Sequence, residues 1–185
     1  MGSVVYPACE IVKPGTIKHI AGNRFSLGEP EGSESDRLKF ISDILKRAGF
    51  RAPIQKNIRD EIWLKLIGNL SFNPISALTG ATLEQICNDQ GTEAIVRAMM
   101  TEAKIIAEEL GAKINMSIEK RIDGARKVGA HKTSMLQDIE AGKPIEIDSI
   151  IIAVKELGEL TCSPTPYIDT ILNLTLQKAK LIGCL

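Results

Sequence analysis

The spacing of apolar residues changes near residue 57 of the sequence. Before that point, short apolar runs alternate with clusters of turn residues, a pattern typical of antiparallel strands. From residue 57 to the C-terminus, apolar residues recur every three or four positions, as they do in amphipathic helices. We therefore predict a β-rich segment over residues 1–56 and an all-helical domain over residues 57–185.

The β-rich segment predicts a meander of short antiparallel strands. These strands are expected at Val4–Tyr6, Glu10–Val12, Ile17–Ile20 and Arg24–Leu27. Pro14 fixes φ and Gly15 tolerates a positive φ, so this pair indicates a turn between the second and third strands. A helix over residues 35–48 is expected to end at Gly49, and a last short strand is expected over residues 50–54.

The helix expected after Asn57 carries an unusual polar row. Lys65, Asn69 and Asn73 stand four residues apart, so they lie along one side of the helix. Asn is a poor helix former because its side chain competes for backbone hydrogen bonds. The row is explained either by donors and acceptors that line a cleft or by an amphipathic helix whose polar side faces water. Pro74 is expected to kink or restart the helix.

Further helices are predicted by the same periodicity. They are expected to open at Thr82 and to cover residues 91–110, 117–128, 134–141, 149–160 and 166–182. Residues 91–110 form the longest predicted helix. Thr82 and Gln85 have the spacing of a capping box, and Asp148 and Thr165 are expected to cap the last two helices.

The composition excludes several classes of protein. The chain has 23 Lys and Arg residues and 23 Asp and Glu residues, a balance that argues against a nucleic-acid or anionic-membrane surface. The longest aliphatic run, Ile150–Val154, is far too short to span a membrane, and we see no signal peptide. Four scattered cysteines without a Cys-x-x-Cys motif, together with two histidines, predict no metal site. We expect a cytoplasmic protein with reduced thiols.

Two motifs resemble a known family. The first is the string Trp-Leu-Lys at residues 63–65 with Asn69, Asn73 and Pro74. The second is Ser-Met-Leu-Gln-Asp-Ile at residues 134–139, followed by Glu-Ile-Asp at residues 146–148. Together they resemble the C-terminal domain of the ketopantoate reductases (2-dehydropantoate 2-reductases). The segments before residue 31 resemble the closing strands of that family's nucleotide domain, so the resemblance covers nearly the whole chain.

The resemblance implies a mainly α fold. It would be a helical domain like the C-terminal domain of 6-phosphogluconate dehydrogenase, preceded by a short β-rich remnant of a Rossmann-type domain. It also implies an oxidoreductase of pantothenate biosynthesis that reduces 2-dehydropantoate, or a related 2-oxo acid, to the 2-hydroxy acid with NADPH. The expected partner is therefore a small 2-oxo acid, with no nucleic acid and no membrane.

The resemblance also assigns roles to five residues. Lys65 takes the position of the catalytic general acid, and Glu146 matches a catalytic acidic residue that orients the lysine or binds substrate. Asn69, Asn73 and Ser134 match substrate-binding positions. Taken singly, each has an ordinary explanation: Lys65 as a solvated helix lysine, Ser134 as a helix cap and Glu146 as a surface charge.

The chemistry of a ketone reduction suits these residue types. Hydride delivery builds negative charge on the carbonyl oxygen, and a positioned ammonium such as that of Lys65 stabilises the charge and supplies the proton. Burial would lower the pKa of this lysine and a nearby carboxylate would raise it, so the sequence leaves the sign open. A hydroxyl at the start of a helix, as at Ser134, lies near free backbone N–H groups that suit a substrate carboxylate.

The sequence departs from the family in its first part. The family's Gly-x-Gly-x-x-Gly turn is absent, because Gly28 and Gly32 have the wrong spacing and open no phosphate-binding helix. We therefore expect the substrate-binding part of a reductase, inactive alone and without tight NADPH binding. A stand-alone ligand-binding or dimerisation module without catalysis is the alternative. The missing sheet would leave an unpaired edge on the strand over residues 4–12 or on a neighbouring strand, and this edge predicts a homodimer.

Overall fold

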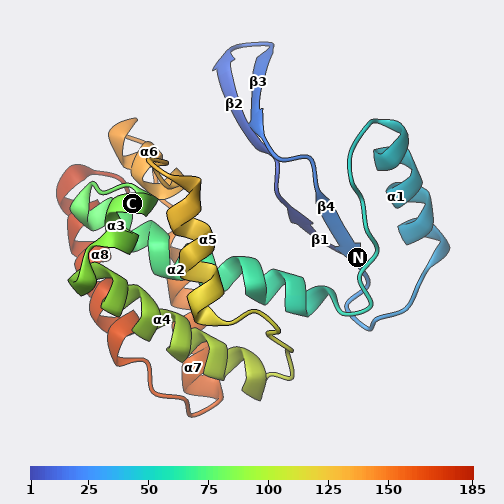
Figure 1. Cartoon of the computed structure of the whole chain (residues 1–185). Coiled ribbons are helices and arrows are strands. Elements are labelled where there is room, and N and C mark those ends of the chain that lie inside the picture. Colours follow the sequence, from blue (N-terminus) through green and yellow to red (C-terminus); the bar gives the residue numbers. More distant parts are fainter. The chain divides into compact units, whose positions relative to one another are not determined.

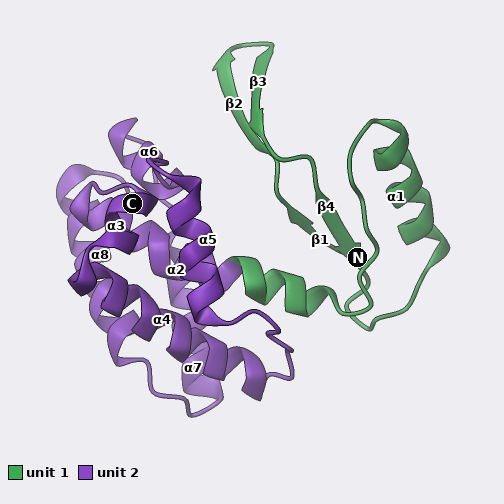
Figure 2. Ribbon diagram, viewed as in Figure 1, with its two compact units in different colours: residues 1–65 green, residues 66–185 purple.

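The chain divides into two compact units, residues 1–65 and residues 66–185, in a computed structural model that describes all 185 residues (Figures 1 and 2). Helix α2 (Ile58–Thr79) begins in the first unit and continues in the second. The predicted boundary at residues 56/57 thus coincides with the start of α2, whereas the division between the compact units falls within the helix. None of the helices combines the length and the hydropathy of a membrane span.

The first unit contains four strands and one helix before α2. They are β1 (Gly2–Val5), β2 (Ala8–Lys13), β3 (Thr16–Ala21), β4 (Phe25–Gly28) and α1 (Asp36–Arg47). β1 pairs antiparallel with β4, and β2 pairs antiparallel with β3. The predicted meander is therefore wrong, because the β2–β3 hairpin is inserted between two strands that pair with each other. Gly22 permits this path, since a Cβ there would lie 2.6 Å from the carbonyl oxygen of Tyr6 at the base of the hairpin.

The strand predicted over residues 50–54 forms only two isolated parallel bridges. These bridges join Arg24 to Arg51 and Leu27 to Ile54. Pro53 lies between them and has no N–H to donate, so a regular ladder cannot run through this segment. Its carbonyl oxygen still accepts a 3.0 Å hydrogen bond from the N–H of Leu27.

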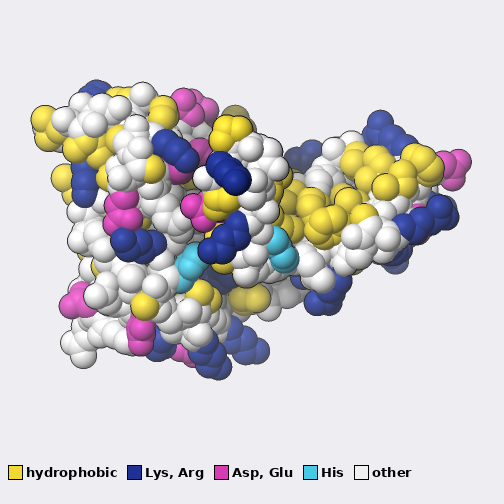
Figure 3. Space-filling model, turned by 90° about the horizontal axis from the view of Figure 1, so that it is seen from above, with side chains coloured by type: hydrophobic (Ala, Val, Ile, Leu, Met, Phe, Trp, Pro, Cys, Tyr) yellow, Lys and Arg dark blue, Asp and Glu magenta, His cyan; other side chains and the backbone are white.

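The apolar core of the first unit is small. It is centred on Leu27, Leu38 and Ala52, with partly buried side chains from β4 and α1 around it. Other large apolar side chains of this unit face solvent, among them Phe40 on α1 and the hairpin residues Ile11 and Ile17. Hydrophobic side chains accordingly form a broad exposed area on the first unit, at the right of Figure 3. The first unit therefore leaves much apolar surface unburied.

The second unit is helical, as predicted. Besides the end of α2, it contains α3 (Leu83–Asn88), α4 (Gln90–Glu109), α5 (Ile118–Val128), α6 (Ser134–Glu140), a π-helical turn (Asp148–Ile152), α7 (Ala153–Leu160) and α8 (Pro166–Ile182). α4 contacts α3, α5, α7 and α8. Its Met99, Met100 and Ile106 are fully buried.

α2 does not end at Pro74 but continues to Thr79, which makes it longer than α4, with 22 residues against 20. The prediction of α4 as the longest helix is therefore wrong. Pro74 lies between buried Phe72 and Ile75. We attribute the continuation to this packing, which offsets the backbone hydrogen bond that proline cannot make.

One of the predicted helix caps is found, and two are not. Thr82 and Gln85 form the predicted capping box of α3. Asp148, in contrast, is the first residue of the π-helical turn and caps nothing, and the Thr165 side chain makes no capping hydrogen bond.

A carboxylate from another helix caps α8 instead. The Glu102 side chain, on α4, accepts hydrogen bonds of 2.9 Å from the backbone N–H groups of Tyr167 and Ile168. Burial raises the pKa of Glu102, and the two backbone donors partly offset this effect. The start of α8 is thus fixed by a residue far away in the sequence.

Candidate functional site

The polar row of α2 is a feature of the folded chain. Lys65, Asn69 and Asn73 occur on successive turns of one uninterrupted helix, so they share one of its sides. Lys65 and Asn69 are half-buried, and only 5% of Asn73 is exposed. A row that simply faces water is therefore excluded for Asn73, because a buried amide carries a desolvation cost that an exposed one does not.

Lys65 is held by the first unit. Its Nζ donates a 2.6 Å hydrogen bond to the carbonyl oxygen of Val5, the last residue of β1. The same Nζ lies 5.8 Å from the centre of the Tyr6 ring, within the range of a cation–π contact. The ammonium is thus directed toward the end of β1 by two adjacent residues.

A carboxylate one turn before Lys65 joins the same region of the first unit. Oε1 of Glu61 accepts a 3.0 Å hydrogen bond from Arg24, and Oε2 accepts from Ser26 at 3.0 Å and from the Tyr6 hydroxyl at 3.2 Å. The Arg24 guanidinium also lies 5.3 Å from the centre of the Tyr6 ring. Sequence reasoning missed these contacts, although the four-residue spacing from Glu61 to Lys65 indicates a shared side of α2.

Ser134 and Glu146 lie later in the second unit, and both are exposed. Ser134 is the first residue of α6, but the cap is the preceding Thr133, whose Oγ1 accepts from the N–H of Leu136 at 3.3 Å. The ordinary explanation of Ser134 as a cap is therefore wrong, and its hydroxyl is available for another partner.

The segment that carries Glu146 is anchored on both sides. Its neighbours Ile145 and Ile147 are buried, and the N–H of Ile145 donates a 3.0 Å hydrogen bond to the carbonyl oxygen of Cys184. The N–H of Ile147 donates a 3.0 Å hydrogen bond to the carbonyl oxygen of Ile145, so Glu146 stands at the centre of a tight turn between two buried side chains. The backbone around Glu146 is thus fixed while its carboxylate faces solvent.

The start of α1 does not fit the phosphates of a dinucleotide. Glu29 is 1% exposed there and accepts hydrogen bonds from the Ser35 hydroxyl and from both Nε and Nη2 of Arg37. Arg37 and then Ser35 hold the pKa of Glu29 well below its usual range, so this carboxylate is charged. The backbone is also covered, because a Cβ on Gly28 would lie 2.7 Å from the side chain of Ile58. Arg37 is thus already paired with a buried carboxylate, and the backbone at Gly28 leaves little room for a phosphate.

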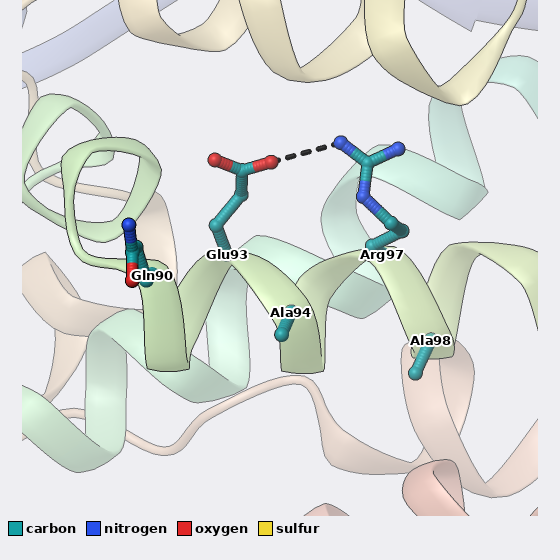
Figure 4. Close-up of a pocket in the computed structure, with 5 residues that line it drawn as sticks. All are labelled: Gln90, Glu93, Ala94, Arg97 and Ala98. Carbon is teal, nitrogen blue, oxygen red and sulfur yellow. Dashed lines mark hydrogen bonds and ion pairs between the residues drawn. The ribbon is translucent and has the colours of Figure 1, made fainter.

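An open depression of about 340 Å³ lies along α4 (Figure 4). Glu93 and Arg97 project from one side of the helix and are joined by a 2.8 Å ion pair, whereas Ala94 and Ala98 project from another side. Arg97 also pairs with Glu119 at 2.6 Å. These charges tie α4 to α5, and the depression contains none of the predicted site residues.

A second cavity, of about 440 Å³, is an apolar groove between α2, α4 and α8. Its lining includes Ile75, Ile95, Leu174 and Leu181. Leu174 is 52% exposed and Leu181 is 78% exposed. The groove suits an apolar surface rather than a small polar acid.

Comparison with known proteins identifies the family. Residues 57–179 match the family model described as the ketopantoate reductase PanE/ApbA C-terminal domain. A protein of Mesorhizobium japonicum named 2-dehydropantoate 2-reductase is 54% identical over 184 residues, which cover 100% of this chain and 56% of that protein. The chain thus spans little more than half the length of this relative.

Solved structures agree with this assignment. A candidate ketopantoate reductase from Ralstonia solanacearum MolK2 superposes with a TM-score of 0.94 at 43% identity, covering 100% of this chain and 56% of the other. The 2-dehydropantoate 2-reductase of Methylococcus capsulatus gives a TM-score of 0.91 at 30% identity, covering 98% of this chain and 63% of the other. The family motifs and the helical fold thus agree, and the chain belongs to the ketopantoate reductase family.

Proposed function

We propose that these 185 residues form the substrate-binding part of an NADPH-dependent 2-dehydropantoate 2-reductase. The observation that carries the proposal is the row on α2, in which a lysine and two asparagines follow one side of a single helix in a chain that belongs to this family. The 54% identity to a protein named 2-dehydropantoate 2-reductase supports the same substrate class. A related 2-oxo acid remains within the proposal, because the row suits any small acid with a carbonyl oxygen.

Lys65 is the proposed general acid. As the carbonyl carbon is reduced, its oxygen gains negative charge, which a nearby ammonium stabilises before it donates the proton. Asn69 and Asn73 each offer an N–H donor and a carbonyl acceptor, and they are proposed to hold the substrate. Ser134 is proposed to bind the substrate carboxylate and Glu146 to orient the lysine or the substrate.

The hydride would come from NADPH, but the start of α1 does not fit its phosphates. We therefore propose that NADPH binds to a separate nucleotide-binding domain. The Mesorhizobium relative is longer than this chain and has room for such a domain. Within these 185 residues we expect no tight NADPH site, and no step of the chemistry is assigned to cofactor-binding residues here.

A homodimer is also proposed. The exposed leucines of α8 beside the apolar groove leave a surface that a second copy could cover. The free edge of β1 is the other candidate surface, since β1 pairs only with β4. Light scattering at micromolar concentration tests the assembly, and a monomer would contradict it.

Turnover by the isolated 185 residues tests the main proposal. Mixed with NADPH and 2-dehydropantoate, they should oxidise no NADPH and should show no saturable NADPH binding at sub-millimolar concentration. Positioning of the reactants can supply roughly 7–11 kcal/mol of barrier lowering, which a general acid alone does not replace. Joining the nucleotide domain of the Mesorhizobium relative ahead of the chain should restore turnover. Ordinary turnover by the 185 residues would contradict the assignment of the cofactor to another domain.

A further inference from the structure

Glu61 stands four residues before Lys65 on α2, so the two side chains lie on the same side of the helix. A Glu and a Lys at this spacing commonly pair on helix surfaces. In this chain both carboxylate oxygens of Glu61 accept hydrogen bonds from residues near β1 and β4: Arg24 on Oε1, and Ser26 and Tyr6 on Oε2. The carboxylate is therefore fixed by three donors that come from a distant part of the sequence.

Tyr6 connects this carboxylate to the lysine. Its hydroxyl donates to Glu61 at 3.2 Å, and its ring lies under the Lys65 ammonium at 5.8 Å. Its backbone N–H donates a 2.9 Å hydrogen bond to the carbonyl oxygen of Arg24. Tyr6 is thus held at its backbone and at its hydroxyl, with its ring beside the lysine.

We propose that Glu61 is a positioning residue for Lys65 and acts through the Tyr6 hydroxyl. The inference rests on the proposed role of Lys65 as general acid. A lysine side chain has a flexible four-carbon stem, so an acid of this type gains from neighbours that limit its rotamers. The fixed ring of Tyr6 and the carbonyl oxygen of Val5, 2.6 Å from Nζ, provide two such neighbours.

A purely structural role for Glu61 makes different predictions. The Arg24–Glu61 ion pair is partly exposed, with 36% of the arginine side chain accessible, and pairs of this kind contribute little to stability. If Glu61 served only that pair, removing the Tyr6 hydroxyl would leave catalysis unchanged. If Glu61 positions the lysine, removing the Tyr6 hydroxyl should lower kcat, because the acid acts in the transition state. KM for the substrate should stay the same.

The test uses the fusion described above, in which the nucleotide domain of the Mesorhizobium relative precedes this chain. Tyr6→Phe removes the hydroxyl but keeps the ring under Lys65, and Glu61→Gln keeps the shape of the side chain but removes its charge. Each should lower kcat for 2-dehydropantoate by about three- to tenfold at unchanged KM, and the double variant should be no slower than Glu61→Gln, because the two residues act in series. Arg59→Gln is the matched control, since Arg59 is exposed on the same turn of α2.

Three outcomes would overturn the proposal. Wild-type kcat in Tyr6→Phe and Glu61→Gln, or a change confined to KM, would exclude positioning while leaving the proposed function intact. Full activity of Lys65→Ala would instead remove the role of Lys65 and the proposal with it. If Glu61→Gln fails to fold, judged by Trp63 fluorescence, Tyr6→Phe decides alone, because it leaves the Arg24–Glu61 pair in place.

Discussion

The two units differ in what holds them together. The first unit has a small apolar core around Leu27 and Leu38, and its buried carboxylate Glu29 is tied to Arg37. The second unit is built on apolar packing around α4, where Met99 and Ile106 are fully buried. A unit with little apolar burial depends on specific polar contacts for its structure, whereas a well-packed helical unit tolerates exposed polar residues.

The proposed functional residues follow this division. Lys65 is held by contacts of the first unit, whereas Asn69, Asn73, Ser134 and Glu146 belong to the second. The proposed acid is thus positioned by a polar network and the proposed substrate residues by a packed scaffold. Mutations should therefore affect the two units in different ways.

The largest effect is expected in the packed core of the second unit. Ile106→Ala should lower the free energy of unfolding by about 2–5 kcal/mol, because a large side chain is removed from a fully buried site. Urea unfolding followed by circular dichroism at the helix band measures this loss, and the fluorescence of Trp63, the only tryptophan, reports on the first unit. An equal shift in the urea midpoints of both signals would show that the two units unfold together. That result would contradict the conclusion that different contacts stabilise them.

A smaller loss is expected at the start of α8. Glu102→Ala should lower the free energy of unfolding by about 0.5–2 kcal/mol, since two backbone N–H groups lose their acceptor. Glu102→Gln is the matched control and should cost less, because it keeps one acceptor and removes a charge that burial disfavours. If both variants unfold at the same urea concentration as the wild type, the carboxylate is not a cap.

Acid should weaken the first unit through Glu29. Its pKa is lower in the folded chain than in the unfolded chain, so its contribution to stability is present above the unfolded value of about 4.3 and is lost as the pH falls through the acid range. Arg37→Ala removes the main cause of the lowered pKa, so the acid midpoint of the Trp63 fluorescence change should move to higher pH. Lys39→Ala, at an exposed position of α1, serves as the control.

The smallest effect is expected in the β2–β3 hairpin. Ile17→Thr should change the free energy of unfolding by less than about 0.5 kcal/mol, because Ile17 is 69% exposed and loses no buried contact. The same urea experiment measures this change. A loss as large as that of Ile106→Ala would mean that the hairpin is covered in solution, and light scattering would then show whether a second copy covers it.

The sequence predicted the helices well because their signals are local. The periodicity of α4 and the capping box at Thr82 lie within a few residues of the elements that they define. The pairing of β1 with β4 and the capping of α8 by Glu102 depend on residues far apart in the sequence, so no local pattern could indicate them. Pro74 does not restart the helix for a similar reason, since α2 continues through it with buried neighbours on either side.

The candidate site was likewise predicted only where its signals are local in the sequence. The four-residue spacing of Lys65, Asn69 and Asn73 predicted a shared side of α2, and the helix provides it. The contacts of Glu61 with Tyr6 and Arg24 span 55 and 37 residues, so only the folded chain reveals them. The roles of Ser134 and Glu146 came from the family resemblance and stay predictions.

The most direct test of the account is the effect of Lys65→Ala on turnover in the protein that carries a nucleotide domain. With saturating NADPH and 2-dehydropantoate, kcat should fall by about 10²–10⁴-fold, the usual contribution of a general acid. Asn69→Ala in the same protein should mainly raise KM, because that residue is assigned to substrate binding. A Lys65→Ala variant that folds, binds NADPH and keeps wild-type kcat would contradict the central claim that Lys65 is the acid.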